Sequence, residues 1–401
     1  MKKTLWKCSN KKLKDSNLFK FENFLKKKYK INYQNNFAKL WEWSIKYQEE
    51  FWKSIWQYLN IKGQLSNKSI RFSKIFYKNE FLSNSKLNFT ENLLAKNDDS
   101  FAITFISENG YKENKTWNDL KKDVTKISRW LKSVGIKKND RIAAYLPNYI
   151  ETVEAFLASV SIGAIWSSCS PDFGTRGVIE RFSQINPKVL FIADKYYYNG
   201  RRIDVLSRAQ EILNNIPSIG QLVIVTYPGS KTNKKNLNIK NTNILKWKDI
   251  FDENYDKTNF ELFDFNHPLA ILYSSGTTGK PKCICHRTGG VLLQHIKEHA
   301  LHCDIKPNDK IFYFTTCGWM MWNWLVSSLA LKASILLFDG FPMYKKEDLL
   351  IEIANNENVT LFGISAKYID TLRKKKINTI KKFNLSRLKT ICSTGSPLSK
   401  D

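Results

Sequence analysis

Strand and helix signals alternate along most of this chain, from residue 100 to its end. Short apolar segments with strand character are separated by longer segments with helical periodicity. Strands are expected at 102–106, 141–146, 164–167, 189–193, 222–226, 269–273, 310–314, 334–338, 360–362 and 388–392. Helices are expected at 116–134, 149–162, 176–185, 204–213, 290–302, 322–331, 346–355 and 367–375. This alternation predicts an α/β fold with parallel-rich sheets sandwiched by helices.

The ends of two segments carry recognisable signals. Thr116 suits the N-cap of the helix at 116–134, because Asp119 follows three residues later, and Gly135 suits the end of that helix. The polar, lysine- and asparagine-rich stretch at 229–243 is expected to be a surface loop.

Residues 1–95 do not show the alternation and are expected to be mostly helical. Their clearest feature is an apolar stripe with helical spacing between residues 51 and 59. It consists of Phe51, Trp52, Ile55, Trp56 and Leu59. A stripe of this kind indicates core packing in preference to a ligand platform.

The stretch from Leu272 to Lys282 has the most unusual composition. It begins at the end of the apolar segment 269–273, which is expected to be a buried strand. It continues with small and hydroxylated residues. These are Ser274, Ser275, Gly276, Thr277, Thr278 and Gly279, followed by Lys280, Pro281 and Lys282. Glycine lets a backbone approach an anion, and N–H groups, hydroxyls and a lysine charge favour phosphate. We therefore predict a polyphosphate-binding loop after a strand, where ligands bind in such sheets.

A loop of this composition has two other interpretations. A Walker A loop needs Ser or Thr after its lysine and opens directly into a helix, whereas Pro281 follows Lys280 here and favours extended backbone. With no acidic magnesium motif after a strand, a P-loop kinase or NTPase is disfavoured. A polar surface hairpin between two strands is the other alternative.

The full string resembles the phosphate-binding loop of the adenylate-forming enzymes: acyl-CoA synthetases, luciferases and peptide-synthetase adenylation domains. Residues 315–324 resemble the segment that lines the acyl pocket in acetyl-CoA synthetases, although a Met/Trp cluster alone would indicate ordinary core. Residues 164–174 resemble the corner near the thioester site. Residues 392–398 resemble the adenine-contacting turn, with Ser396 in place of the usual Glu.

Other strings resemble acetoacetyl-CoA synthetases in particular. Cys283 replaces the glycine usual in the wider family, but the string at 282–286, the histidines at 295, 299 and 302, and Ser396 are similar to this subfamily. The strings at 40–44 and 87–94 are similar to the N-terminal extension of short-chain acyl-CoA synthetases.

The resemblance implies the large N-terminal domain of an adenylate-forming enzyme. It divides the chain into a helical extension at 1–95 and an AMP-binding domain at 96–401, incomplete at its C-terminal end and without the C-terminal domain. Relatives continue with a motif for the α-phosphate and magnesium, an aspartate for the ribose and a domain that carries a lysine. The chain stops at Asp401. We therefore expect a truncated coding sequence or partial gene, whose isolated product is poorly soluble and inactive.

The resemblance also implies an activity: an AMP-forming acid–thiol ligase that joins acetoacetate to CoA. Acetoacetate would attack MgATP to give acetoacetyl-adenylate and pyrophosphate, and the CoA thiol would then displace AMP. ATP, Mg²⁺ and CoA are thus the expected ligands. An acetyl- or propionyl-CoA synthetase, or another short-chain acyl-CoA ligase, is the alternative.

Residue roles follow from the same resemblance. Thr277 and Lys282 are the implied catalytic residues. The ATP-binding residues are Ser274, Ser275, Gly276, Thr277, Thr278, Gly279, Lys282, Gly395, Ser396 and Pro397. Arg201 is the implied contact to the CoA phosphates. Trp319, Met320, Met321 and Thr394 are the implied border of the acyl group.

The formal net charge of +27 raises the alternative of a nucleic-acid-binding protein. The lysines are spread along the whole chain, and Asn and Ile are also abundant. This indicates a composition bias instead of a binding stripe, and no nucleic acid is expected as a partner.

The cysteines and histidines offer a weak case for a metal. Seven scattered cysteines, with no signal peptide and no apolar run long enough for a membrane span, indicate reduced thiols and a cytoplasmic location. His295, His299 and His302 could share one helix face and bind zinc, but Cys283-x-Cys285 is not a usual zinc spacing. No metal held by protein ligands is predicted, and the oligomeric state is left open.

Overall fold

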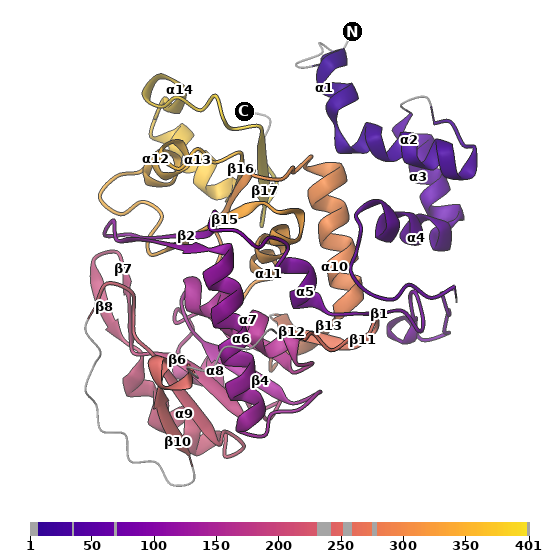
Figure 1. The fold of residues 1–401 in the computed structure, drawn as a ribbon. Helices are drawn as coiled ribbons and strands as arrows, with labels where there is room; N and C mark the ends of the chain where they lie inside the picture. The colour runs from indigo at the N-terminus through magenta and orange to yellow at the C-terminus, as the bar shows by residue number, and fades with distance from the viewer. Residues whose placement is uncertain are drawn as a thin grey trace.

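The computed structural model describes residues 7–33, 36–67, 70–230, 242–251, 259–274 and 279–398. Two large sheets form its body (Figure 1). The first has the order β10-β9-β6-β4-β5-β12-β13, and the second has the order β17-β16-β14-β15-β2-β3. Neighbouring strands are parallel except for two antiparallel pairs at sheet edges, β12–β13 and β2–β3. The predicted parallel-rich α/β fold is confirmed.

The strands of the first sheet are β4 (Arg141–Tyr145), β5 (Ile165–Cys169), β6 (Val189–Ala193), β9 (Gln221–Val225), β10 (Asn243–Lys246), β12 (Pro268–Ser274) and β13 (Lys282–Arg287). Those of the second are β2 (Phe101–Ser107), β3 (Lys112–Thr116), β14 (Lys310–Tyr313), β15 (Ser334–Asp339), β16 (Leu361–Ser365) and β17 (Thr390–Thr394). Two small antiparallel pairs stand apart: β1 (Lys86–Leu87) with β11 (Phe263–Asp264), and β7 (Lys195–Tyr198) with β8 (Arg201–Asp204).

The helices follow the predicted alternation closely. They are α1 (Asn10–Asp15), α2 (Asn17–Tyr29), α3 (Phe37–Lys46), α4 (Gln48–Tyr58), α5 (Phe89–Leu93), α6 (Trp117–Ser133), α7 (Ile150–Ser161), α8 (Thr175–Phe182), α9 (Ala209–Asn215), α10 (Thr288–Lys297), α11 (Met320–Ser327), α12 (Leu349–Asn356), α13 (Ala366–Lys374) and α14 (Thr379–Lys382). A π-helical turn, Glu298–His302, extends α10.

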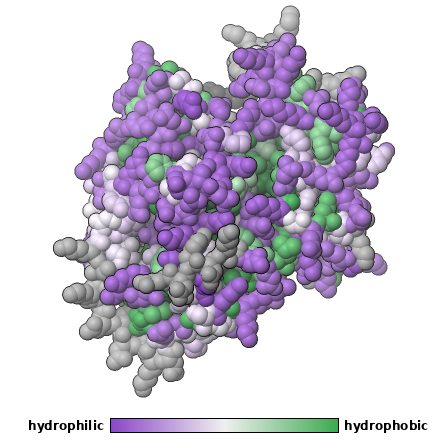
Figure 2. All heavy atoms as spheres, viewed as in Figure 1, coloured by the Kyte–Doolittle hydropathy of each residue, from purple (hydrophilic) through white to green (hydrophobic). Residues whose placement is uncertain are grey.

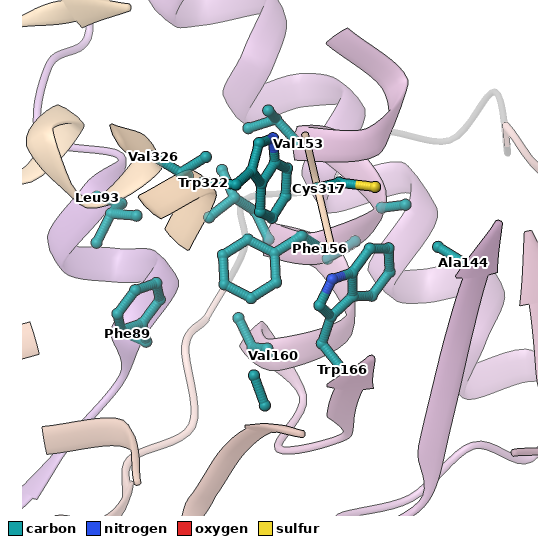
Figure 3. Close-up of a cluster of buried hydrophobic side chains, with 14 of the residues drawn as sticks. Phe89, Leu93, Ala144, Val153, Phe156, Val160, Trp166, Cys317, Trp322 and Val326 are labelled. Carbon is teal, nitrogen blue, oxygen red and sulfur yellow. The ribbon is translucent and has the colours of Figure 1, made fainter. Parts of the chain in front are cut away.

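Helix α7 lies between the two sheets, because it contacts β5 of the first and β2 of the second. Apart from the half-buried Glu151, all its residues are buried, as expected for a helix covered on every side. Its Phe156 ring lies 5.8 Å from Trp166 and 5.4 Å from Trp322, centroid to centroid (Figure 3). These aromatic contacts join the two sheets in one hydrophobic core.

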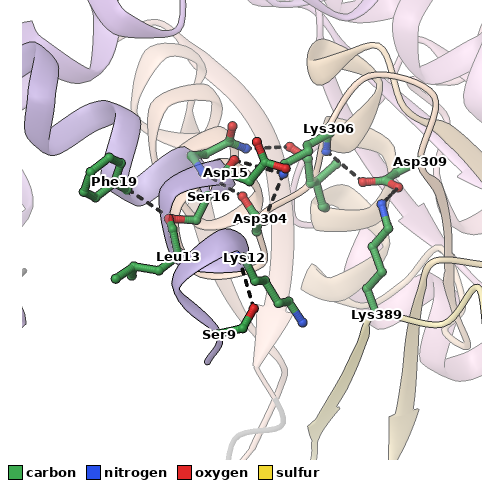
Figure 4. Close-up of polar contacts among 12 residues, drawn as sticks. Ser9, Lys12, Leu13, Asp15, Ser16, Phe19, Asp304, Lys306, Asp309 and Lys389 are labelled. Atoms are coloured by element: carbon green, nitrogen blue, oxygen red, sulfur yellow. Dashed lines mark hydrogen bonds and ion pairs between the residues drawn. The ribbon is translucent and has the colours of Figure 1, made fainter. Parts of the chain in front are cut away.

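The N-terminal helices are bound to the rest of the chain by polar contacts (Figure 4). The backbone N–H of Asn17 donates to Asp304 (2.7 Å), and its amide side chain donates to the carbonyl of Ile305 (2.9 Å). Lys306 donates to the carbonyl of Asp15 (3.0 Å). Residues of α2, α3 and α4 also belong to the main hydrophobic core, and Ile55 and Trp56 are buried as the predicted stripe requires.

Two details of the prediction need correction. The strand at 269–273 exists, but only Leu269 and Ala270 are buried, whereas Ile271 to Ser274 are half-buried toward the sheet edge. Seven strands were not predicted individually: β1, β3, β7, β8, β10, β11 and β13. Most of the predicted loop at 229–243 lies outside the described residues.

The face drawn in Figure 2 is mostly hydrophilic, with apolar areas between the hydrophilic residues. Among the described residues, no helix combines the length and apolar character that crossing a membrane would need.

Candidate active site

The predicted phosphate loop connects β12 and β13, which pair so that Ser274 lies opposite Lys282. Ser275, Gly276, Thr277 and Thr278 lie outside the described residues. Ser274 is half-buried, while Gly279 and Lys282 are exposed. The stretch is therefore a hairpin, as one alternative interpretation held, and a hairpin loop is still compatible with phosphate binding.

The base of this hairpin is held by the neighbouring elements. Ser167 of β5 donates to the carbonyl of Ile271 (2.9 Å) and lies 3.1 Å from the hydroxyl of Tyr273. On the other side, the amide of Gln184 donates to the carbonyl of Pro281 (2.9 Å). Both ends of the loop are thus oriented from the end of the first sheet and from the segment after α8.

The segment after β14, which carries the predicted acyl-site residues, is bound to the first sheet through Asn148. The amide of Asn148 donates to the carbonyls of Thr315 (3.2 Å) and Phe338 (3.3 Å) and accepts from the indole of Trp322 (2.9 Å). Asn148 follows β4, so the carboxyl ends of strands from both sheets meet here. In open α/β sheets, this is the edge at which ligands bind.

Gly318 brings the 315–324 segment against the corner after β5. Ser168 donates to the carbonyl of Cys317 (2.7 Å). A Cβ at Gly318 would lie 3.5 Å from the Phe173 ring and 3.6 Å from the backbone N of Ser170. The corner at 164–174 and the segment at 315–324, both singled out in the sequence, are therefore neighbours.

The predicted acyl-site residues divide between solvent and core. Trp319 and Met320 are 60% and 45% exposed, and Met321 is half-buried. Trp322 is fully buried in the aromatic cluster of Figure 3. The core interpretation therefore holds for Trp322, whereas Trp319 and Met320 leave large apolar surface at the carboxyl edge of the sheets.

The predicted adenine turn follows β17 in the second sheet. Thr394 pairs with Ser365 at the end of β16, and Gly395 follows with a φ of 90°, which favours glycine. Thr394, Gly395, Ser396 and Pro397 are all exposed. One strand, β16, separates β17 from β14. The turn after β17 and the 315–324 segment after β14 therefore begin at the same sheet edge, and the two strands they follow lie roughly 10 Å apart.

Arg201 lies apart from these residues, on β8 of the small β7–β8 hairpin, and is exposed. No hydrogen bond or ion pair within the described ranges joins it to the other predicted site residues. The hairpin is positioned by Glu108, which follows β2.

Buried carboxylates near this edge were missed in the sequence. Asp339, the last residue of β15, accepts from the hydroxyl of Tyr227 (3.1 Å), and burial raises its pKa to about 7. Glu108, also buried, accepts three backbone N–H groups. Asn148, Glu108 and Asp339 all stand at or just after the carboxyl ends of strands, and that position was the available signal.

The histidines of the α10 segment make structural contacts. A ring nitrogen of His295 lies 2.9 Å from the hydroxyl of Ser327, and one of His299 lies 2.8 Å from the carbonyl of Trp324. Burial lowers the pKa of both to about 3, so both rings are neutral. The part of the chain that the structure describes contains no group of three or more His, Cys, Asp or Glu side chains placed to bind a metal ion.

Two cavities lie elsewhere, against the N-terminal helices. One, of about 540 Å³, is bordered by Tyr58, Lys62 and Lys332, and the other, of about 470 Å³, by Trp41, Trp52 and Lys297. Neither contains a predicted site residue. The candidate site is instead the open edge formed by the β12–β13 hairpin, the β5 corner, the 315–324 segment and the turn after β17.

Comparisons with known proteins agree with this geometry. The profile of the AMP-binding enzyme family matches residues 90–401. An acetoacetyl-coenzyme A synthetase from Rhizobium meliloti (strain 1021) is 41% identical over 360 residues, covering 90% of this chain and 55% of the relative. A malonamoyl-CoA synthetase from Penicillium aethiopicum is 34% identical over 420 residues, covering 98% of this chain and 58% of the relative.

The solved structure of an acetoacetyl-CoA synthetase from Streptomyces lividans superposes with a TM-score of 0.91 at 30% identity. The match covers 99% of this chain and 60% of that structure. The chain thus spans between half and two thirds of the length of the relatives it matches.

Proposed function

The chain belongs to the AMP-binding enzyme family. From that membership we propose that the protein to which it belongs catalyses the ATP-dependent ligation of acetoacetate to CoA. Acetoacetate would first form acetoacetyl-adenylate and pyrophosphate, and CoA would then release AMP. The observation that carries this proposal is the β12–β13 pair, which brings Ser274 opposite Lys282 at the two ends of the Ser/Gly/Thr/Lys stretch.

The roles of the loop residues follow from charge. An attacking carboxylate and a triphosphate are both anions, so the reaction needs positive charge and N–H donors that are already in place. Lys282 is exposed opposite Ser274 at the mouth of the loop, where its ammonium group can meet the β- and γ-phosphates. We assign Ser275 to Thr278 to the same phosphates on their composition.

Mg²⁺ would accompany the triphosphate and neutralise part of its charge. The described ranges contain no group of three or more His, Cys, Asp or Glu side chains placed to bind a metal ion. The chain's own contribution is to hold the nucleotide: Lys282 and Ser274 at the phosphates, and Gly395, Ser396 and Pro397 at the adenine.

The acyl group would lie beside Trp319, Met320, Met321 and Thr394. The exposed apolar surface of Trp319 and Met320 suits a short carbon chain better than a charged group. Two similar proteins are named for acetoacetyl and malonamoyl groups. Both groups have a carbonyl two carbons from the acyl carbon, so we propose a short acid with this pattern as substrate.

The test is acyl-adenylate recognition. Stable sulfamoyl analogues of the acetyl, propionyl, acetoacetyl and octanoyl adenylates would be titrated into this chain by calorimetry. We expect the acetoacetyl analogue to bind at least about tenfold more tightly than the acetyl analogue. A clear preference for acetyl would overturn the acyl assignment, and no binding of any analogue would overturn the proposed function itself.

A further inference from the structure

Residues 71–78, called here the 71–78 loop, are all exposed and lie between α4 and β1 at the periphery of the molecule (Figure 1). Four of them carry large apolar or aromatic side chains. Phe72, Ile75, Phe76 and Tyr77 are 69%, 41%, 89% and 72% exposed. Single exposed apolar residues are normal on a protein surface, but a group of large ones on one loop marks an interaction surface.

The backbone of this loop is fixed although its side chains face outward. Arg71 and Glu80 exchange two backbone hydrogen bonds (2.8 and 3.0 Å), which close the loop. The guanidinium group of Arg287, at the end of β13, donates to the carbonyls of Asn79 (2.5 Å) and Tyr77 (2.5 Å). Folding the exposed rings back onto the core would break these bonds, so their exposure is a property of the fold.

The charges within the loop are all positive. Arg71, Lys74 and Lys78 are exposed and alternate with the apolar side chains, and residues 71–78 contain no aspartate or glutamate. Arg71 lies 3.7 Å from Glu80, but its side chain is still 65% exposed. The cores of protein–protein interfaces are depleted in lysine, whereas aromatic rings beside lysine and arginine suit the headgroup region of a membrane. The combination therefore favours a lipid surface over another protein.

The loop lies away from the candidate active site. Arg287, which holds it, pairs with Pro268 at the start of β12, whereas Ser274 and Lys282 pair at the opposite end of the same two strands. The length of β12 separates the two ends by roughly 20 Å. A membrane contacted through the 71–78 loop would therefore leave the carboxyl edge of the sheets open to small-molecule substrates.

We propose that the 71–78 loop is a membrane-docking surface, which inserts Phe72 and Phe76 into the headgroup region of a bilayer that contains anionic phospholipids. Lys74 and Lys78 meet the negative charges of the headgroups. Apolar burial and charge attraction each contribute to binding of this kind, and the chain then lies on the membrane without crossing it. This inference goes beyond the proposed ligation and does not depend on it.

Flotation of the chain with large unilamellar vesicles on a density gradient tests the proposal, because aggregated protein sinks while vesicle-bound protein rises. Vesicles of phosphatidylcholine alone are compared, at about 0.15 M salt, with vesicles that contain about one third phosphatidylserine. We expect the unmodified chain to bind the anionic vesicles at least about tenfold more tightly. Phe72→Ser combined with Phe76→Ser should weaken that binding at least about tenfold, because the inserted apolar surface is lost.

A second variant and two controls separate the apolar part from the charged part. Lys74→Gln combined with Lys78→Gln should weaken binding to the anionic vesicles at least about tenfold and change binding to the neutral ones less than about twofold. Ile380→Ser is the apolar control, because Ile380 is 85% exposed beside two lysines on α14. Lys132→Gln combined with Lys248→Gln is the charge control, since both lysines are exposed near the first sheet. Both controls should keep the affinity within about twofold.

The other outcomes overturn the proposal. If the unmodified chain does not float with anionic vesicles, the loop is not a membrane-docking surface. If Phe72→Ser combined with Phe76→Ser floats like the unmodified chain, the binding is general adsorption of a basic protein. If the Lys74 and Lys78 variant loses no more than its control, the assignment to anionic lipids is wrong. If the chain instead self-associates in sedimentation velocity without vesicles, does not float, and loses this association with the two serines, a second copy covers the loop.

Discussion

Lys282 shows how a single residue can be tested without disturbing the fold. Its side chain is exposed on β13 and makes no ion pair within the described ranges. Lys282→Ala should change the free energy of unfolding by less than about 0.5 kcal/mol. If the ammonium group binds phosphate, its loss should weaken MgATP binding roughly ten- to a hundredfold.

The control for this variant is Lys248→Ala, which removes the same charge from an exposed lysine beside β10, at the opposite edge of the first sheet. Calorimetric titration of MgATP into both folded variants gives the comparison. Equal affinities in the two variants would contradict the phosphate role.

Because of Glu151, the stability of the folded chain should depend on pH. Although the residue as a whole is half-buried, one of its carboxyl oxygens is fully buried. That burial, followed by the nearby charge of Glu154, raises the pKa of Glu151 to about 8 from an ordinary value of 4.5. The folded state therefore binds the proton more strongly than the unfolded state. Its stabilising contribution is complete below pH 4.5 and is lost as pH rises through 8.

Glu151→Gln should therefore match the unmodified protein at pH 5 and be more stable by roughly 2–4 kcal/mol at pH 8.5. Urea unfolding at both pH values measures this, with the exposed Glu211→Gln as control. Parallel pH profiles for Glu151→Gln and the unmodified protein would show that this carboxyl is ionised in the fold.

At the scale of elements, helix α6 has a testable N-cap. The hydroxyl of Thr116 accepts from the backbone N–H of Asp119 (3.0 Å) and donates to its carboxylate (2.7 Å), as predicted from the sequence. Thr116→Ala should cost about 1 kcal/mol in the free energy of unfolding. Thr116→Ser keeps the hydroxyl and should cost much less in the same urea titration; an equal loss would mean that the cap contributes little.

Most elements were predictable because their apolar residues repeat with the period of a strand or a helix. The strand β3 was missed because its sequence, Lys-Glu-Asn-Lys-Thr, has no apolar face and occupies a sheet edge. The β7–β8 hairpin was missed although Asn199-Gly200 is a strong turn signal.

The candidate site was predictable to a similar degree. The strings that form it could be found one by one, and the rule for parallel sheets places them at one edge. Their mutual arrangement was not predictable, because it depends on single polar contacts such as Ser168 to Cys317 and Asn148 to Thr315. No periodicity in the sequence encodes such contacts.

At the scale of the whole molecule, the net charge of +27 can be tested by the salt dependence of DNA binding. Binding through 6–10 phosphate contacts makes the logarithm of affinity fall with a slope of roughly −5 to −9 against the logarithm of salt concentration. Scattered lysines should give only weak DNA retention on filters, with a slope shallower than about −3. A steeper slope would support the interpretation of the chain as a nucleic-acid-binding protein.

Replacing Asn148 measures how much its contacts between the two sheets contribute to the free energy of unfolding. Asn148→Ala would leave the carbonyls of Thr315 and Phe338 and the indole N–H of Trp322 without this partner. We expect a loss of roughly 2–4 kcal/mol in urea unfolding. Asn214→Ala, at an exposed helical position, is the control. A loss no greater than that of the control would mean that water replaces the amide at no cost.

The same three contacts bear on the order in which the molecule folds. The partners of Asn148 lie 167, 174 and 190 residues further along the chain. These contacts connect the end of β4 in the first sheet with the end of β15 and the segment after β14 in the second sheet, so they need strands of both sheets in place. A chain in which each sheet has formed separately would already have most of its secondary structure and still lack the edge where ligands bind. Binding competence should therefore appear late during refolding, after the recovery of helical and strand signals.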